Sequence, residues 1–170
     1  LVIWSDADSS GVGDVKIGWY AKLNTANGAE SKTAVSGGGD IVLAGGADSN
    51  ADGRPDGFAR GRSGVTWAIL LLPHLEIYSG GGDILMRGQS NSSYGLLVYP
   101  TTEIFSGTGT IDLTGETTAS GRGFIFADYD IDRGFDDFLT VVSPATSAPA
   151  VSISARSAGS HETVRLCGSG

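Results

Sequence analysis

The sequence predicts an all-β protein, a right-handed parallel β-helix whose coils of about 27 residues each contribute three short strands. One glycine-rich phrase recurs along the chain, and apolar residues alternate in the strand that follows each copy. Glycine accounts for 27 of the 170 residues, which indicates many sharp turns. A coil of this length accommodates three strands of about five residues and three turns of about four.

The recurring phrase combines a serine, a glycine-rich turn and an apolar strand that ends at glycine. Its copies read Ser10-GVGDVKIG, Ser36-GGGDIVLAG, Ser79-GGGDILMRG and Ser106-GTGTIDLTG, with a weaker Thr146-SAPAVSISA. The four serines are 26, 43 and 27 residues apart, so one interval is about 16 residues too long. We therefore expect a single β-helix fragment over residues 1–170, part of a larger protein, with acidic insertions at about 45–64 and about 128–140.

Two further strands complete each expected coil. The first is Ala68-ILLL, repeated as Gly95-LLVY and Gly123-FIFA, and the second is Pro73-HLEIY, repeated as Pro100-TTEIF. In the glycine-rich repeat, alternation predicts two inward columns: Val15, Ile41, Ile84, Ile111 and Val151; then Ile17, Leu43, Met86, Leu113 and Ile153. Val42 and Leu85 fall between them, facing outward. We expect the first insertion or a partner to cover them, unless they are scattered surface aliphatics.

Charge and hydropathy exclude two classes of partner. Nineteen acidic and eleven basic residues give a net charge of −8, which repels nucleic acid phosphates. The richest apolar stretch, 65–72, is shorter than the 18 residues of a membrane span, so membrane insertion is not expected. Cys167 has no second cysteine with which to form an internal disulfide.

The first insertion has the ligand spacing of a calcium loop. Positions 1, 3, 5, 7 and 9 of an EF-hand or thrombospondin-type loop correspond to Asp48, Asn50, Asp52, Arg54 (through its carbonyl) and Asp56. Gly53 allows the bend at position 6, whereas Ala59 stands where a bidentate glutamate is expected. Turn-forming residues in a surface loop explain the same letters, so calcium and a polar turn are both open interpretations.

Weaker metal candidates lie in two other acidic segments. They are Asp6, Asp8 and Asp14 near the start of the chain, and Asp128, Asp130, Asp132 and Asp136 in the second insertion. Asp14, Asp40 and Asp83 also occupy equivalent positions of the repeat. Stacked carboxylates repel each other, and backbone N–H donors in their own glycine turns, or a cation, would relieve that repulsion.

The phrases SGGGDIxLxG, EIYSGGGDI and EIFSGTGTI resemble the β-helical shafts of filamentous-haemagglutinin-type adhesins and related two-partner-secreted or autotransporter exoproteins. The resemblance covers about residues 10–127 and, weakly, 146–155. It implies a large extracellular or cell-surface bacterial protein whose adjoining repeats are its partners, with a host-cell, neighbouring-cell or polysaccharide ligand. Such shafts have no catalytic residues to carry over.

The leading hypothesis is a structural or adhesive shaft, stabilised by calcium and without enzymatic activity. The alternative is a β-helical domain that binds or cleaves polysaccharides. His74 aligns with Thr101 and is expected at a surface turn, which argues against catalysis. Aromatic residues that could stack on sugars are Trp19, Tyr20, Trp67, Tyr94, Tyr99 and Tyr129. Aromatic and polar residues gathered on one face of adjacent coils would favour the alternative, and dispersed ones the shaft.

Overall fold

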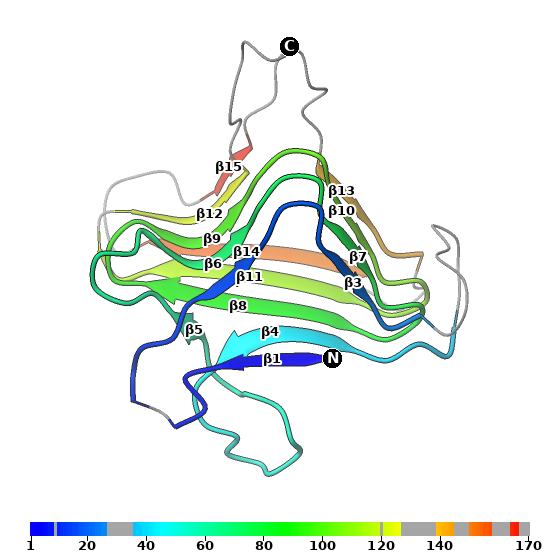
Figure 1. Ribbon diagram of the computed structural model, residues 1–170, viewed down its shortest axis with the longest axis horizontal. Coiled ribbons are helices and arrows are strands. Elements are labelled where there is room, and N and C mark those ends of the chain that lie inside the picture. The colour runs from blue at the N-terminus through cyan, green and yellow to red at the C-terminus, as the bar shows by residue number, and fades with distance from the viewer. Residues whose placement is uncertain are drawn as a thin grey trace.

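The computed structural model describes residues 1–8, 10–26, 36–119, 121–126, 139–144, 150–157 and 164–166. Within these ranges the chain is all-β, without helices, and every pairing between named strands is parallel. The described strands form three sheets, seen as three sides around one interior in Figure 1.

Each sheet contains strands from successive coils, in chain order. Sheet 1 contains β1 (Val2–Ser5), β4 (Ile41–Gly45), β8 (Ile84–Ser90), β11 (Ile111–Thr117) and β14 (Val151–Ser157), with β5 (Ala59–Arg60) also paired to β8. Sheet 2 contains β2 (Val15–Ile17), β6 (Trp67–Leu71), β9 (Tyr94–Val98), β12 (Arg122–Phe126) and β15 (Val164–Leu166). Sheet 3 contains β3 (Lys22–Asn24), β7 (Glu76–Tyr78), β10 (Thr102–Phe105) and β13 (Leu139–Val142).

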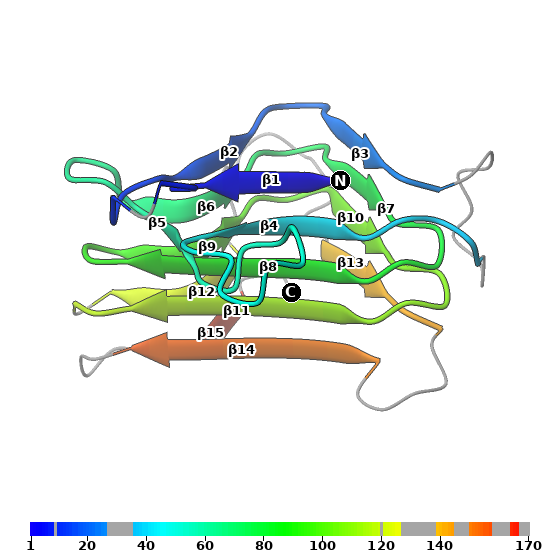
Figure 2. The same ribbon diagram turned by 90° about the horizontal axis from the view of Figure 1, so that it is seen from below.

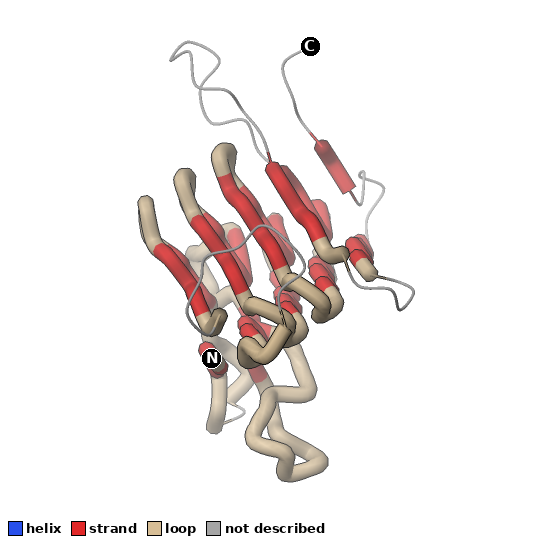
Figure 3. The backbone as a smooth tube through the Cα atoms, turned by 90° about the vertical axis from the view of Figure 1, so that its right-hand side faces the viewer, coloured by secondary structure: helices blue, strands red, loops and turns tan. Residues whose placement is uncertain are grey.

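The chain visits the three sheets in a constant order: sheet 1, sheet 2, sheet 3, then sheet 1 again. Equivalent strands of successive rounds therefore lie side by side, as the rungs in Figure 3 show. Three strands per round of about 27 residues were expected from the repeat, and the register agrees, since Ile84 pairs with Ile111 and Ile77 with Ile104.

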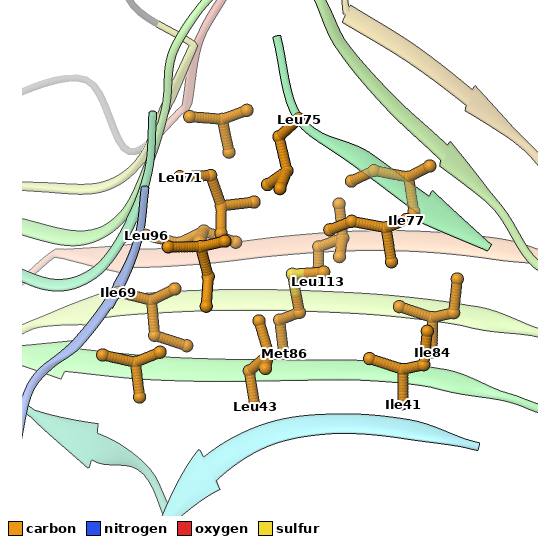
Figure 4. Packing of buried hydrophobic residues seen from close by; sticks show 14 of the residues in the cluster. Ile41, Leu43, Ile69, Leu71, Leu75, Ile77, Ile84, Met86, Leu96 and Leu113 are labelled. Carbon is orange, nitrogen blue, oxygen red and sulfur yellow. The ribbon is translucent and has the colours of Figure 1, made fainter. Parts of the chain in front are cut away.

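Aliphatic side chains from all three sheets fill a single interior (Figure 4). In sheet 1, the two predicted inward columns run through Ile41, Ile84 and Ile111 and through Leu43, Met86 and Leu113, each at most 1% exposed. Val151 and Ile153 continue these columns on β14 but remain 36% and 40% exposed. Burial of such side chains stabilises the fold by about 1.5–3 kcal/mol each.

The placement of the first repeat copy was wrong. Val15 and Ile17 lie in β2, where they pair with Ile69 and Leu71 of sheet 2 and not with Ile41 and Leu43. The strand beside β4 is instead β1, in which Ile3 is the partner of Leu43. Glycine followed by alternating apolar residues suits a strand in any of the three sheets, so the similarity could not assign one.

The predicted serine column is also corrected. Ser79 and Ser106 stack at the corner between sheets 3 and 1, where both are fully buried, but Ser10 and Ser36 are exposed. Thr25 takes the place of Ser36, since its Oγ1 donates to the carbonyls of Gly39 and Ser79. An insertion after Thr25 shifted the apparent register, so the serine spacing matched by coincidence.

Glycines allow backbone to touch backbone where sheets 1 and 2 meet. A Cβ built on Gly95 would lie 2.5 Å from the Glu116 carbonyl oxygen and 2.6 Å from that of Gly88. Gly115 and Gly123 make the equivalent close approach one coil later. None of these four glycines has a positive φ, so close packing and not a turn conformation requires glycine at these positions.

Candidate functional site

The acidic insertion interrupts sheet 1 between β4 and β5. β4 pairs with the first half of β8, and β5 pairs with its second half. Residues 46–58 therefore form a loop between two short strands that together flank β8. An antiparallel bridge between Gly45 and Gly57 closes the neck, and the Asp56 N–H donates to the Ala47 carbonyl at 3.0 Å. Figure 2 shows this loop in front of the outer face of sheet 1.

Within the loop, backbone N–H groups bind the predicted ligand oxygens. Asp48 accepts from Asp52 N–H at 3.1 Å and from Gly53 N–H at 2.8 Å, and the Gly53 φ of 82° favours glycine. Asp52 accepts from Arg54 N–H at 2.9 Å. Among the residues described, no group of three or more His, Cys, Asp or Glu side chains is arranged to hold a metal ion.

Asp56 closes the other side of the loop. Its carboxylate accepts from the Ser49 hydroxyl and from the Ser49 N–H, the latter at 2.7 Å. These hydrogen bonds lower the pKa of Asp56 below its ordinary value, because they favour the charged form. The Asn50 amide nitrogen lies 3.3 Å from an Asp52 oxygen and 3.5 Å from an Asp56 oxygen. Asn50, Asp52 and Asp56 thus have neighbouring side chains, while the Asp48 carboxylate is bonded to backbone N–H groups of the same loop.

The loop is attached to the sheet beneath it. The Arg54 guanidinium lies 2.5 Å from the Asp40 carboxylate, and Arg87 donates to the Asp56 carbonyl at 3.4 Å. Val42, which faces outward, is only 1% exposed, and it lines a hollow of about 190 Å³ together with Arg54 and Leu85. Leu85, the other outward aliphatic, is half-buried, and Arg54 is the residue of the first insertion that borders the hollow beside both of them.

The weaker metal candidates near the start of the chain do not lie together. Asp6 accepts from the Ser10 hydroxyl at 2.8 Å and from Gly11 N–H at 2.9 Å. Desolvation raises the pKa of Asp6. The two hydrogen bonds just given, together with a third from the Val12 N–H and a fourth with Asp8, have a larger combined effect, so the pKa lies below its ordinary value. Asp14 lies apart, 3.0 Å from Arg62. Asp128, Asp130, Asp132 and Asp136 lie outside the described residues.

The repeated carboxylates of sheet 1 bond to the next coil. Asp40 accepts the Asp83 N–H at 2.8 Å, and Asp83 accepts the N–H of Thr110, also at 2.8 Å. Asp14 does not belong to this column, because it lies beside β2. Backbone N–H donors therefore relieve the repulsion, but they belong to the following coil and not to the same glycine turn as expected, and the Arg54 guanidinium adds to the relief at Asp40.

A polar groove of about 620 Å³ lies on sheet 3 at its corner with sheet 2. One of its edges is a column of corner residues, Tyr20, His74 and Thr101, all with φ between 57° and 60°. The left-handed conformation is strained for non-glycine residues, particularly a β-branched one, and such strain concentrates at functional sites. The three side chains form a continuous edge: Tyr20 stacks on His74 at 4.6 Å, and the Thr101 hydroxyl lies 3.0 Å from His74 Nδ1.

The floor of the groove is a charged column two residues further along the strands. Lys22, Glu76 and Glu103 are register partners on β3, β7 and β10. Lys22 Nζ lies 2.7 Å from Glu76, and the Tyr78 hydroxyl donates to Glu103 at 3.0 Å. Side chains from three adjacent coils thus form one surface.

Part of the sheet 3 groove could be predicted from the sequence. Aligning Pro73-HLEIY with Pro100-TTEIF superimposes Glu76 on Glu103, so the paired carboxylates were visible as a column. Tyr20 and Lys22 were missed as neighbours because their coil lacks the proline and had been placed in the wrong register.

The other aromatic candidates have a packing role. Trp67, Tyr94 and Tyr99 pack around Leu70 and Leu97 on the outer side of sheet 2. Trp19 lies near the groove, with its ring 6.4 Å from that of Tyr20. Tyr129 lies outside the described residues.

Comparison with protein-family models, with curated proteins and with solved structures finds no match to this chain. Within the described ranges, no helix has the length and hydropathy needed to cross a membrane.

Proposed function

We propose that the chain is a segment of a right-handed parallel β-helix that serves as a structural and adhesive shaft of a bacterial surface or secreted protein. The observation that carries the proposal is the constant order in which the chain visits three parallel sheets around one apolar core. A solenoid of this kind extends by adding coils, and each coil contacts only its neighbours. Its adjoining repeats are then its main partners, while its outer face offers sites for other ligands.

Duplication of one coil tests the shaft directly. A second copy of residues 79–105 inserted between Phe105 and Ser106 continues all three sheets in register. We expect a folded protein, longer by about one strand spacing of 4.8 Å in small-angle X-ray scattering and with a higher melting temperature, since an interface between coils is added. A duplicated protein that loses cooperative unfolding would contradict the shaft.

Calcium binding by the first insertion is part of the same proposal. Asp48, Asn50, Asp52 and Asp56 supply side-chain oxygens in one loop, with the Arg54 carbonyl as a further ligand. The expected dissociation constant is about 10⁻⁴ to 10⁻³ M, as in extracellular modules. Calorimetric titration should show a calcium heat that an Asp48→Ala, Asp52→Ala variant lacks. The matched control is Glu116→Gln, which alters a carboxylate of sheet 1 bonded to Gln89, and equal heats from all three proteins would leave the loop a polar turn.

The competing proposal, an enzyme that cleaves polysaccharides, is supported by the two carboxylates in the sheet 3 groove. It predicts the release of reducing ends from a polysaccharide in proportion to protein concentration. The shaft predicts none. A release that Glu103→Gln abolishes would overturn the non-enzymatic function.

A further inference from the structure

The turn that joins β8 to β9 consists of Asn91, Ser92 and Ser93, at the corner between sheets 1 and 2. Figure 2 shows the end of β8, where this turn begins, at the left edge of the molecule. Asn91 and Ser92 are exposed, and Ser93 is partly exposed. An asparagine followed at the second position by serine, without proline between them, is the acceptor pattern of N-linked glycosylation.

The turn is held by hydroxyls that the acceptor pattern does not use. The Ser90 hydroxyl oxygen accepts the Ser92 N–H at 3.1 Å and the Ser93 N–H at 3.3 Å. The Ser92 hydroxyl donates to the Val65 carbonyl of the preceding coil at 2.9 Å. Within the described residues, the Asn91 carboxamide and the Ser93 hydroxyl make no hydrogen bond. Both groups that define the pattern are therefore accessible to an enzyme without disturbing the turn.

The other described asparagines differ from Asn91 in sequence and in bonding. Asn24 and Asn50 are followed at the second position by Ala26 and Asp52, so neither begins the acceptor pattern. The Asn24 side chain accepts the Ala26 N–H at 2.8 Å, and the Asn50 side chain accepts the Asp52 N–H at 3.1 Å. Among the asparagines that the structure describes, exposure, the pattern and an unbonded carboxamide thus coincide at Asn91 alone.

The turns of the adjacent coils leave space beside Asn91. Gly64 precedes Val65, to which the Ser92 hydroxyl is bonded, and a Cβ built on Gly64 would have no heavy atom within 4 Å. In the following coil the corresponding turn contains Ala119 and Gly121. These small residues lower the steric cost of attaching a bulky group at this corner.

We infer that Asn91 is the acceptor of an N-linked glycan, a modification that goes beyond the proposed shaft. The donor class is a sugar with a phosphate leaving group on its anomeric carbon, either a nucleotide sugar or a lipid-linked oligosaccharide. Asn91 Nδ2 attacks the anomeric carbon and forms the N–C bond, while the bond from that carbon to the phosphate oxygen breaks and its electron pair leaves with the phosphate. The proton lost from Nδ2 passes to a carboxylate of the transferase.

The test exposes the whole folded chain to two transferases in separate arms, one supplied with UDP-glucose and one with a lipid-diphosphate-linked oligosaccharide. Intact mass spectrometry and peptide mapping should show a single glycan, on Asn91, in at least one arm. The mass of that glycan identifies the donor. A synthetic peptide of residues 87–97 should be modified no faster than the folded chain, because the turn is already exposed.

Substitutions in the turn separate the acceptor pattern from the fold. Asn91→Gln and Ser93→Ala should both abolish the modification, and Ser93→Thr should retain it. The matched control is Ser92→Ala, which removes the neighbouring hydroxyl bonded to Val65 and should leave glycosylation unchanged. The protein with residues 79–105 duplicated contains a second copy of the turn and should take a second glycan.

Three results would overturn the inference. They are no modification of the cooperatively folded chain in either arm, modification of the peptide but not of the folded chain, and a modification that persists in Asn91→Gln. The length of the coil-duplicated protein reports on the shaft separately, so a lengthened protein without a glycan refutes the acceptor site alone.

Discussion

Replacement of Gly95 by alanine tests the contact between sheets 1 and 2. The added methyl group would lie 2.5 Å from the Glu116 oxygen and 2.6 Å from the Gly88 oxygen. Both obstacles are backbone atoms, Gly88 from the same coil and Glu116 from the next, so no side chain can rotate away. Overpacking a core costs about 1–3 kcal/mol, and a clash with two strands should reach at least about 3 kcal/mol. For a domain of this size that lowers the melting temperature by about 6–12 °C.

Gly18→Ala is the matched control for this substitution. No heavy atom lies within 4 Å of its added methyl, and its φ is not in the left-handed region. The free energy of unfolding should stay the same or rise by about 0.4–1 kcal/mol, because alanine restricts the unfolded chain. Urea denaturation followed by tryptophan fluorescence measures both variants. Equal stabilities would mean that the two strands do not touch, which would refute the arrangement of the sheets.

Three other substitutions test the core, the buried serines at the corner between sheets 3 and 1, and the loop of the acidic insertion. Ile84→Asp puts an unpaired charge among fully buried aliphatics, so the cooperative thermal transition should be lost, and its retention would show that Ile84 does not face the core. Ser106→Ala removes the hydroxyl that donates to the Gly109 carbonyl at 2.6 Å and should cost about 1–3 kcal/mol in urea denaturation, against less than about 0.5 kcal/mol for exposed Ser10→Ala. The lowered pKa of Asp56 predicts a stabilising contribution that is present above about pH 4 and lost as pH falls through the folded-state value. Asp56→Asn should therefore reduce the loss of stability between pH 5 and pH 2, and an unchanged acid limb of the urea midpoint would contradict that role.

The Glu76 and Glu103 column shows how far repeat alignment reaches toward a site. Both residues follow a proline by three positions, so their stacking could be predicted from the sequence. Their proximity to Tyr20 could not, because that neighbour belongs to a coil with a different corner sequence. The acidic loop shows the converse. Its spacing placed Asp48, Asn50, Asp52 and Asp56 in one insertion, while the attachment of Arg54 to Asp40 depends on the path of the loop across sheet 1.

The sequence by itself determined the parallel strands, the coil of about 27 residues and the two inward columns of sheet 1 from Ile41 to Leu113, because alternation and repeat length are local properties of the chain. Only the tertiary structure decided which sheet each strand joins. The alternation of apolar residues allows Val15 to stack on Ile41 or on Ile69, and its pairing with Ile69 depends on turn lengths that similarity does not measure. The close approach of Gly95 to its neighbours and the groove under Tyr20 are likewise contacts between coils, so no single segment contains the information that specifies them.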